Sequence, residues 1–105
     1  MREMLDENLK RFEELEQQLL DPEVLADPNR VAAVSREHGS LARLAGKYRK
    51  FQGINAEIAD IVMLLEGDDP EIRSLAEAEI PKLKEDREMV WNELLDLTVG
   101  GEDAN

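Results

Sequence analysis

Three Asp-Pro pairs set the boundaries of the segments into which this chain can fold. They are Asp21-Pro22, Asp27-Pro28 and Asp69-Pro70. An Asp side chain can accept hydrogen bonds from the free N–H groups at a helix start, and proline is tolerated at the first helical position. We therefore expect a helix to begin at each pair. Glu23 and Glu71 would then lie in first turns, where the helix dipole favours negative charge.

Apolar residues between these boundaries recur at steps of three and four, the period of an amphipathic helix. The pattern predicts helices over about 3–20, 28–66 and 70–97, with a short helical turn at 21–27. Pro81 lies inside the last helix and should kink it or split it in two. The residues expected to face inward are Leu5, Leu9, Phe12, Leu15 and Leu19, then Val34, Leu41, Leu44, Tyr48, Phe51, Ile58, Val62 and Leu65, and finally Ile72, Ala76, Ile80, Leu83, Val90, Leu94 and Leu97.

The break between the second and third helices, Gly67-Asp68-Asp69, is short, so these helices must fold back on one another as antiparallel neighbours. The predicted fold class is all-α. It is a long antiparallel helical hairpin with an additional N-terminal helix packed on one end, giving a three-helix bundle or coiled-coil-like arm. Residues 1–98 form the helical domain in this interpretation, and residues 99–105 form a flexible tail.

Composition excludes several classes of function. The chain of 105 residues has no cysteine, which rules out disulfides and Cys-ligated zinc or redox sites. Charges are spread through residues 1–10 and no apolar h-region is present, so no signal peptide is expected. No apolar run approaches the ~18 residues of a membrane span. The net charge of −12 argues against the whole chain binding nucleic acid, and no DNA partner is expected.

No residue pattern in the chain predicts catalysis. His38 is the only histidine and Ser35 stands where a helical carboxylate–histidine metal motif would need Glu, so we expect no metal and a histidine packed beside the seam. Asp68, Asp69 and Glu71 lack the spacing of a Ca²⁺ loop and are better explained as helix caps. We expect no nucleophile–base pair, no cofactor and no small-molecule substrate, and the chain is predicted not to be an enzyme.

Polar residues and glycines also fall on the helical pattern. Asn55 and Arg87 occupy seam positions, where an amide can fix register and an arginine usually reaches to the edge. Glycines recur every seven residues, at Gly39, Gly46 and Gly53. This spacing either marks the close approach of a helix or partner, or simply lies on the solvent side.

Basic residues are concentrated in one segment. Residues 30–52 contain six basic residues and one acid, a net charge of +5, so the rest of the chain is −12 − 5 = −17. These cations either face acids of the first helix, such as Glu13, Glu14 and Glu16, or form a docking face for an acidic protein or RNA phosphate. The candidate partner-binding residues are Arg36, Arg43 and Lys50, which are seven residues apart, with Lys47 and Arg49 beside them.

Three stretches resemble the N-terminal domain of the bacterial peptide chain release factor 1 family, which are class-one translation termination factors. They are 20–28 (LDPEVLADP), 35–41 (SREHGSL) and, most specific, 63–76 (MLLEGDDPEIRSLA). The resemblance covers almost the whole chain, which would stop where such proteins enter their central domains. The family's Gly-Gly-Gln motif and stop-codon-reading tripeptide are absent, since Gly100-Gly101 is followed by Glu102.

The resemblance implies an interaction domain of a cytoplasmic protein that releases finished chains at UAA and UAG codons. Its implied partners are the ribosomal stalk base, both protein and rRNA, and the methyltransferase that modifies the family's Gly-Gly-Gln glutamine; a membrane is not among them. A free-standing helical-hairpin coiled-coil adaptor or chaperone-like protein is the alternative interpretation. A small helical metalloenzyme is a third, which the missing ligands disfavour.

Overall fold

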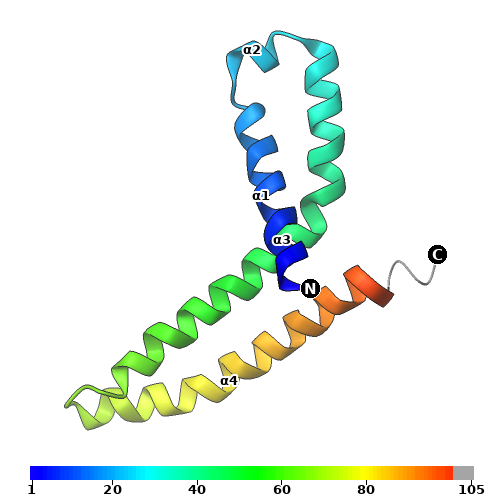
Figure 1. Ribbon diagram of the computed structural model, residues 1–105. Helices are drawn as coiled ribbons and strands as arrows, with labels where there is room; N and C mark the ends of the chain where they lie inside the picture. The colour runs from blue at the N-terminus through cyan, green and yellow to red at the C-terminus, as the bar shows by residue number, and fades with distance from the viewer. Residues whose placement is uncertain (101–105) are drawn as a thin grey trace. The chain divides into compact units, whose positions relative to one another are not determined.

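The fold of this chain is all-α over the residues that the structure describes, 1–100 of a computed structural model (Figure 1). Those residues contain no strand, which confirms the predicted fold class. The elements are α1 (Arg2–Gln18), α2 (Pro22–Leu25), α3 (Pro28–Leu64), α4 (Pro70–Leu95) and a terminal π-helical turn, η1 (Asp96–Gly100). Residues 101–105 of the expected tail lie outside the described part.

Helices α2, α3 and α4 begin at the three Asp-Pro pairs, as predicted. The side chain of Asp21 accepts a hydrogen bond from the backbone N–H of Glu23 at 3.0 Å, and that of Asp69 accepts one from Glu71 at 2.9 Å. At the start of α3, the Asp27 carboxylate accepts from the N–H of Asn29 at 3.1 Å. Each carboxylate therefore satisfies a backbone donor that has no partner within its helix.

The chain divides into two compact units, and the boundary falls inside α3 between Tyr48 and Arg49. The first unit contains α1, α2 and the N-terminal part of α3. The second contains the rest of α3 together with α4 and η1. Each unit has its own buried apolar seam.

In the first unit, α1 and the N-terminal part of α3 run antiparallel (Figure 1). The aromatic ring of Phe12 stacks on that of His38, with ring centroids 4.2 Å apart. Tyr48 is buried, and its hydroxyl donates a hydrogen bond to the carboxylate of Asp6. The buried apolar residues of this unit are Leu5, Leu9, Phe12, Leu15, Val24, Ala45 and Tyr48.

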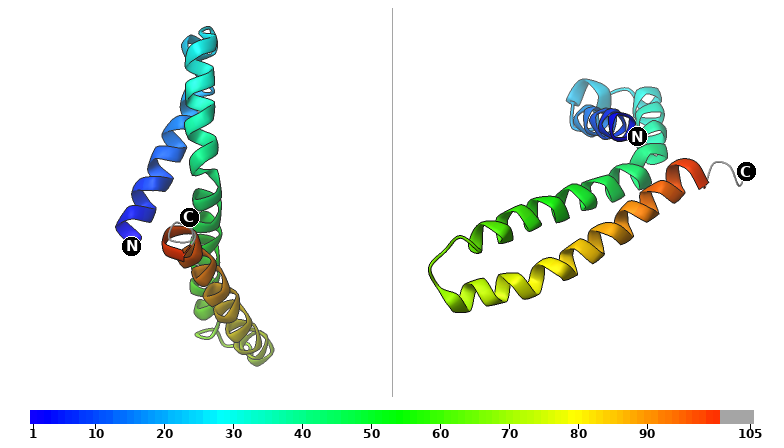
Figure 2. Two further views of the ribbon diagram at one scale, coloured as in Figure 1. Left: turned by 90° about the vertical axis from the view of Figure 1, so that its right-hand side faces the viewer. Right: turned by 60° about the horizontal axis from the view of Figure 1, so that its bottom comes forward.

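In the second unit, the C-terminal part of α3 and α4 form the predicted antiparallel hairpin (Figure 2). Phe51 of α3 packs against Trp91 of α4 with ring centroids 5.0 Å apart. The other buried apolar residues of the hairpin are Ile58, Ala76, Leu83, Val90 and Leu94. These residues recur at helical spacing, so each helix contributes one narrow stripe to the seam.

Two of the residues expected to face inward are exposed instead. Val62 is 42% exposed and Ile72 is 44% exposed, whereas Ile61 is half-buried. Two facing helices can cover only one stripe of each other, and near the loop the stripe on α3 passes through Ile61 rather than Val62. The inward assignment of Val62 and Ile72 is therefore wrong.

Pro81 lies within α4 and does not split it, because the helix runs unbroken from Pro70 to Leu95. Proline removes the N–H that would bond the carbonyl four residues earlier, which belongs to Glu77. Both Pro81 and Glu77 are exposed, so water can satisfy that carbonyl. The loss of one hydrogen bond on a solvated face is tolerated.

Candidate partner-binding surfaces

The exposed cations of the basic segment are distributed over both units. In the first unit, Arg36 and Arg43 are exposed on α3 two turns apart, a rise of about 10.5 Å. Lys47 is half-buried there and interacts with other residues of the chain. In the second unit, Arg49 and Lys50 are exposed, and Arg49 also has interactions within the chain.

Intramolecular neutralisation does not account for three of these five cations. Among the residues that the structure describes, no ion pair involves Arg36, Arg43 or Lys50. Two of the α1 acids that the sequence offers as partners for these cations lie beside other residues. Glu14 lies 3.5 Å from Arg11, and Glu16 lies 3.8 Å from Nε2 of His38.

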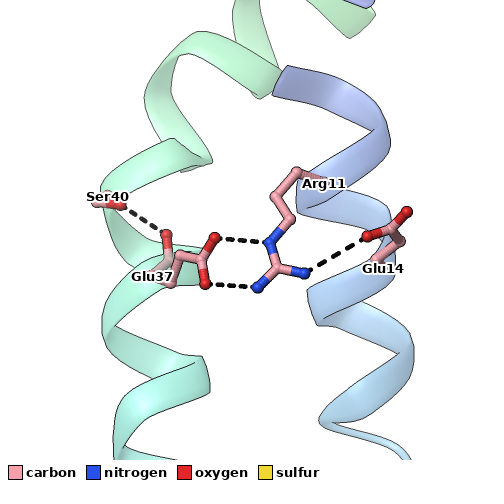
Figure 3. Close-up of polar contacts among 4 residues, drawn as sticks. All are labelled: Arg11, Glu14, Glu37 and Ser40. Atoms are coloured by element: carbon pink, nitrogen blue, oxygen red, sulfur yellow. Dashed lines mark hydrogen bonds and ion pairs between the residues drawn. The ribbon is translucent and has the colours of Figure 1, made fainter. Parts of the chain in front are cut away.

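The single acid of the basic segment, Glu37, is held by α1. The guanidinium of Arg11 donates two hydrogen bonds to the Glu37 carboxylate, from Nε at 2.6 Å and from Nη2 at 2.7 Å (Figure 3). These bonds hold the pKa of the Glu37 carboxyl below its ordinary value, against the opposing effect of desolvation. The planar fork of Arg fits both oxygens of one carboxylate, so the pairing fixes orientation as well as charge.

His38 packs beside the seam of the first unit, as predicted. Its ring is half-buried against Phe12, and its Nε2 atom has no hydrogen-bond partner among the described residues. No group of three His, Cys, Asp or Glu residues within the described chain is arranged to hold a metal ion. His38 is therefore accounted for by packing.

The three regularly spaced glycines do not mark a close helix contact within the chain. Gly39, Gly46 and Gly53 are all exposed, and a Cβ added to any of them would meet no other atom within 4 Å. Of the two interpretations of the spacing, packing between helices of this chain is wrong. The space beside these positions is open.

Asn55 and Arg87 contact one another across the hairpin, which the sequence pattern did not predict. The Nη1 atom of Arg87 donates a hydrogen bond to Oδ1 of Asn55 at 3.1 Å, and both side chains are half-buried. The periodicity of each helix predicts a seam position for each residue, but the pairing depends on the register between the two helices, which neither helix determines alone.

Two apolar hollows of the second unit were also not predicted. One, of about 280 Å³, lies beside the hairpin loop and is lined by Ile61, Leu64, Ile72, Leu75, Ala76 and Glu79. The other, of about 270 Å³, lies further along the hairpin and is lined by Lys50, Ile54, Glu57, Leu83, Asp86, Met89, Val90 and Glu93. The sequence pattern identified seam residues but not the places where the seam stays open.

No helix within residues 1–100 combines the length and apolarity needed to cross a membrane. The chain thus presents, in its described part, two helical units with exposed cations on α3 and open apolar hollows on the hairpin.

The PCRF domain profile matches residues 8–105, nearly the whole chain. The chain therefore belongs to the PCRF domain family, and the family resemblance read from the sequence is confirmed. No solved structure matches it.

The curated relatives are proteins named peptide chain release factor 1. The relative from Symbiobacterium thermophilum is 36% identical over 95 residues, which cover 90% of this chain and 27% of that protein. The relative from Geotalea uraniireducens is 39% identical over 85 residues, covering 81% of this chain and 23% of the relative. The relative from a Geobacillus strain is 33% identical over 95 residues, which cover 90% of this chain and 26% of that protein. The chain thus spans about a quarter of the length of these relatives.

Proposed function

We propose that this chain is the N-terminal interaction domain of a peptide chain release factor that directs termination at UAA and UAG codons in the cytoplasm. The observation that carries the proposal is the match of the PCRF domain over residues 8–105, together with relatives named peptide chain release factor 1. The domain itself is not catalytic in this proposal. It binds the ribosome at the stalk base and the methyltransferase that modifies the parent factor.

The exposed cations of α3 supply the ribosome contact. Arg36 and Arg43 in the first unit, and Lys50 in the second, are exposed and have no ion pair among the described residues. An unpaired surface cation can approach a phosphate without first breaking an internal salt bridge. Lys47 and Arg49 add positive charge nearby. Each phosphate that such a residue neutralises releases a counterion and makes binding salt-dependent.

The test is a charge reversal of the three unpaired cations. The variant Arg36→Glu, Arg43→Glu, Lys50→Glu shifts the net charge from −12 to −18, because each of three substitutions changes it by −2. Binding of the chain to purified ribosomes is measured by sedimentation over a range of salt concentrations. We expect weaker binding at low salt and a log–log salt slope that is flatter by about 2 to 3, given ~0.7–0.9 per phosphate contact.

A matched control separates local contacts from net charge. Lys10, Lys82 and Lys84 are exposed and are also replaced by Glu, which gives the same net charge of −12 − 6 = −18. This control should retain most of the salt slope. Equal slopes for both variants and the unmodified chain, with circular dichroism showing all three folded, would contradict the assigned role of the α3 cations.

Two further measurements test the rest of the proposal. The chain alone should release no formyl-methionine from ribosomes at any stop codon, whereas the intact parent factor should do so at UAA and UAG and not at UGA. Binding of the chain to purified glutamine methyltransferase is measured by calorimetry. If no heat of binding is detected at micromolar concentrations, the methyltransferase is not a partner of this domain.

A further inference from the structure

The hollow on the side of the hairpin away from the loop, named here the flank hollow, is a short groove between α3 and α4. Its apolar lining comes from Ile54 of α3 and from Leu83, Met89 and Val90 of α4, and its volume is about 270 Å³. Leu83 and Val90 are buried, whereas Met89 is 59% exposed. An unbranched methionine in an open position can adapt its shape to an apolar partner. The flank hollow therefore offers an apolar contact that the hairpin itself leaves open.

The shape of the flank hollow favours a helix as its occupant. The residues that line it span 50–57 on α3 and 83–93 on α4, which corresponds to about 10 Å and about 15 Å along the two helices. An extended peptide lying there would place backbone N–H and C=O groups against apolar side chains, which cannot hydrogen-bond to them. A helix satisfies those groups internally and can insert apolar side chains from successive turns between α3 and α4.

Charged residues at the rim of the flank hollow restrict the chemistry of that helix. The rim carries three acids, Glu57, Asp86 and Glu93, and one base, Lys50, a net charge of −2. Among the described residues, neither the Glu57 nor the Asp86 carboxylate has an ion pair, so both can pair with cations of a partner. A second copy of the hollow would bring −2 against −2, and an anionic lipid would be repelled. The rim therefore favours a helix with Lys or Arg beside its apolar stripe.

The placement of these charges also favours one orientation of the helix. In the register set by the Asn55–Arg87 hydrogen bond, Glu57 and Asp86 lie at the end of the flank hollow nearer the loop, and Lys50 lies at the other end. A helix carries partial positive charge at its N-terminus and partial negative charge at its C-terminus. The N-terminal turn of an incoming helix would therefore lie beside the two acids, and its C-terminal turn beside Lys50.

We propose that the flank hollow docks a basic amphipathic helix of another protein, which packs apolar side chains against Met89 and pairs Lys or Arg with Glu57 and Asp86. The inference does not rest on the proposed function. It concerns a surface of opposite preference, because the α3 cations select phosphate whereas the flank hollow selects a basic helix. Lys50 belongs to both surfaces, so a helix in the flank hollow would cover one of the three cations assigned to phosphate.

Designed peptides test the proposal on the 105-residue chain. The basic probe is a helical peptide of about 18 residues, with Leu at steps of three and four and Lys beside this stripe. The acidic probe has Glu in place of every Lys, and the scrambled probe has the composition of the basic probe without the stripe. Each carries fluorescein, and its anisotropy is measured as the chain is added up to ~1 mM. We expect the basic probe to bind, the scrambled probe to bind at least about tenfold more weakly, and the acidic probe not to bind.

A methionine variant shows whether the basic probe binds in the flank hollow. Met89→Ala should weaken its binding about fivefold or more, because an anchor at the centre of a contact carries much of the binding energy. Alanine keeps the helix, so folding is retained. The matched control is Met63→Ala, since Met63 is 67% exposed on α3 of the same hairpin but does not line the flank hollow.

A charge variant tests the two unpaired acids. Glu57→Gln combined with Asp86→Asn should weaken binding of the basic probe about threefold to tenfold at low salt, and the difference should shrink as the salt concentration rises. The control combines Asp60→Asn with Glu77→Gln at exposed positions of the same hairpin outside the flank hollow. Both variants change the net charge equally, to −12 + 2 = −10.

Several results would overturn the proposal. Equal effects of either variant and its control would show only general attraction between a basic peptide and an acidic chain. Failure of the basic probe to bind, binding of the acidic probe, or equal binding of the scrambled probe would exclude a basic amphipathic helix. A dimer of the chain that is lost in Met89→Ala, seen by analytical ultracentrifugation, would make a second copy the occupant instead.

Discussion

The hydrogen bond between Asn55 and Arg87 should set the register of the α3–α4 hairpin. This polar contact joins the two helices directly, with Arg87 Nη1 3.1 Å from Asn55 Oδ1. The aromatic pair of Phe51 and Trp91 lies one turn further from the loop. A slip of either helix would separate the amide from the guanidinium while leaving apolar residues able to find new neighbours.

The contribution of this hydrogen bond to stability depends on how far Asn55 and Arg87 are exposed to water. A hydrogen bond to a charged group contributes ~1.5–3 kcal/mol when buried, but Asn55 and Arg87 are both half-buried, so we expect about 1 kcal/mol. Asn55→Ala loses this bond and gains about half a kcal/mol of helix propensity. Asn55→Ala should therefore be nearly neutral, whereas Arg87→Ala gains little propensity and should lose about 1 kcal/mol, so the interaction is isolated only as a coupling energy.

A double-mutant cycle of Asn55→Ala and Arg87→Ala measures that coupling. Urea unfolding is followed by fluorescence of Trp91, the single tryptophan, which packs in the hairpin and so reports on it alone. We expect a coupling of about 1 kcal/mol. A coupling indistinguishable from zero would refute the register argument and show that apolar packing alone aligns the two helices.

Two other predictions concern α3. Replacing any one of the three glycines of α3, Gly39, Gly46 or Gly53, with Ala should raise the free energy of unfolding by ~0.5–1 kcal/mol, as measured by urea unfolding. Alanine is the better helix former, and the added Cβ would lie in open space. A lower free energy of unfolding for any variant would contradict this geometry. Glu37→Gln should lower the melting temperature at pH 7 but not at pH 3. Arg11 lowers the pKa of Glu37 in the folded state, so the pair stabilises the fold above the unfolded-state pKa, and this stabilisation is lost as the pH falls through the folded-state pKa. A melting-temperature difference between the two proteins that grows in acid would contradict this argument.

Helix positions and starts could be predicted because their causes are local. Asp69 caps the backbone of α4 within two residues of itself, and the period of three to four places Leu5 and Leu94 on seams without knowledge of the partner helix. The effect of Pro81 was harder to predict, because it depends on whether water can reach the Glu77 carbonyl that has lost its helical hydrogen bond. That depends on exposure, which the local sequence does not determine.

Contacts between helices could not be predicted in the same way. The Arg11–Glu37 pair joins residues 26 apart, and the Asn55–Arg87 bond joins residues 32 apart. Their register depends on where each helix ends and turns, and a shift of one residue rotates a side chain by about 100°. For the same reason the seam pattern placed Val62 inward, although it is exposed.

The Arg11–Glu37 pair explains how the basic segment can act in a strongly acidic chain. Glu37 is the only acid among residues 30–52, and it lies next in sequence to Arg36. A carboxylate without a partner of its own could pair with a neighbouring cation, and that cation would then be less able to bind phosphate. Two hydrogen bonds from α1 hold Glu37 away from such a pairing. In the proposed function, this contact would leave Arg36 and Arg43 to bind phosphate, since neither has an ion pair among the described residues.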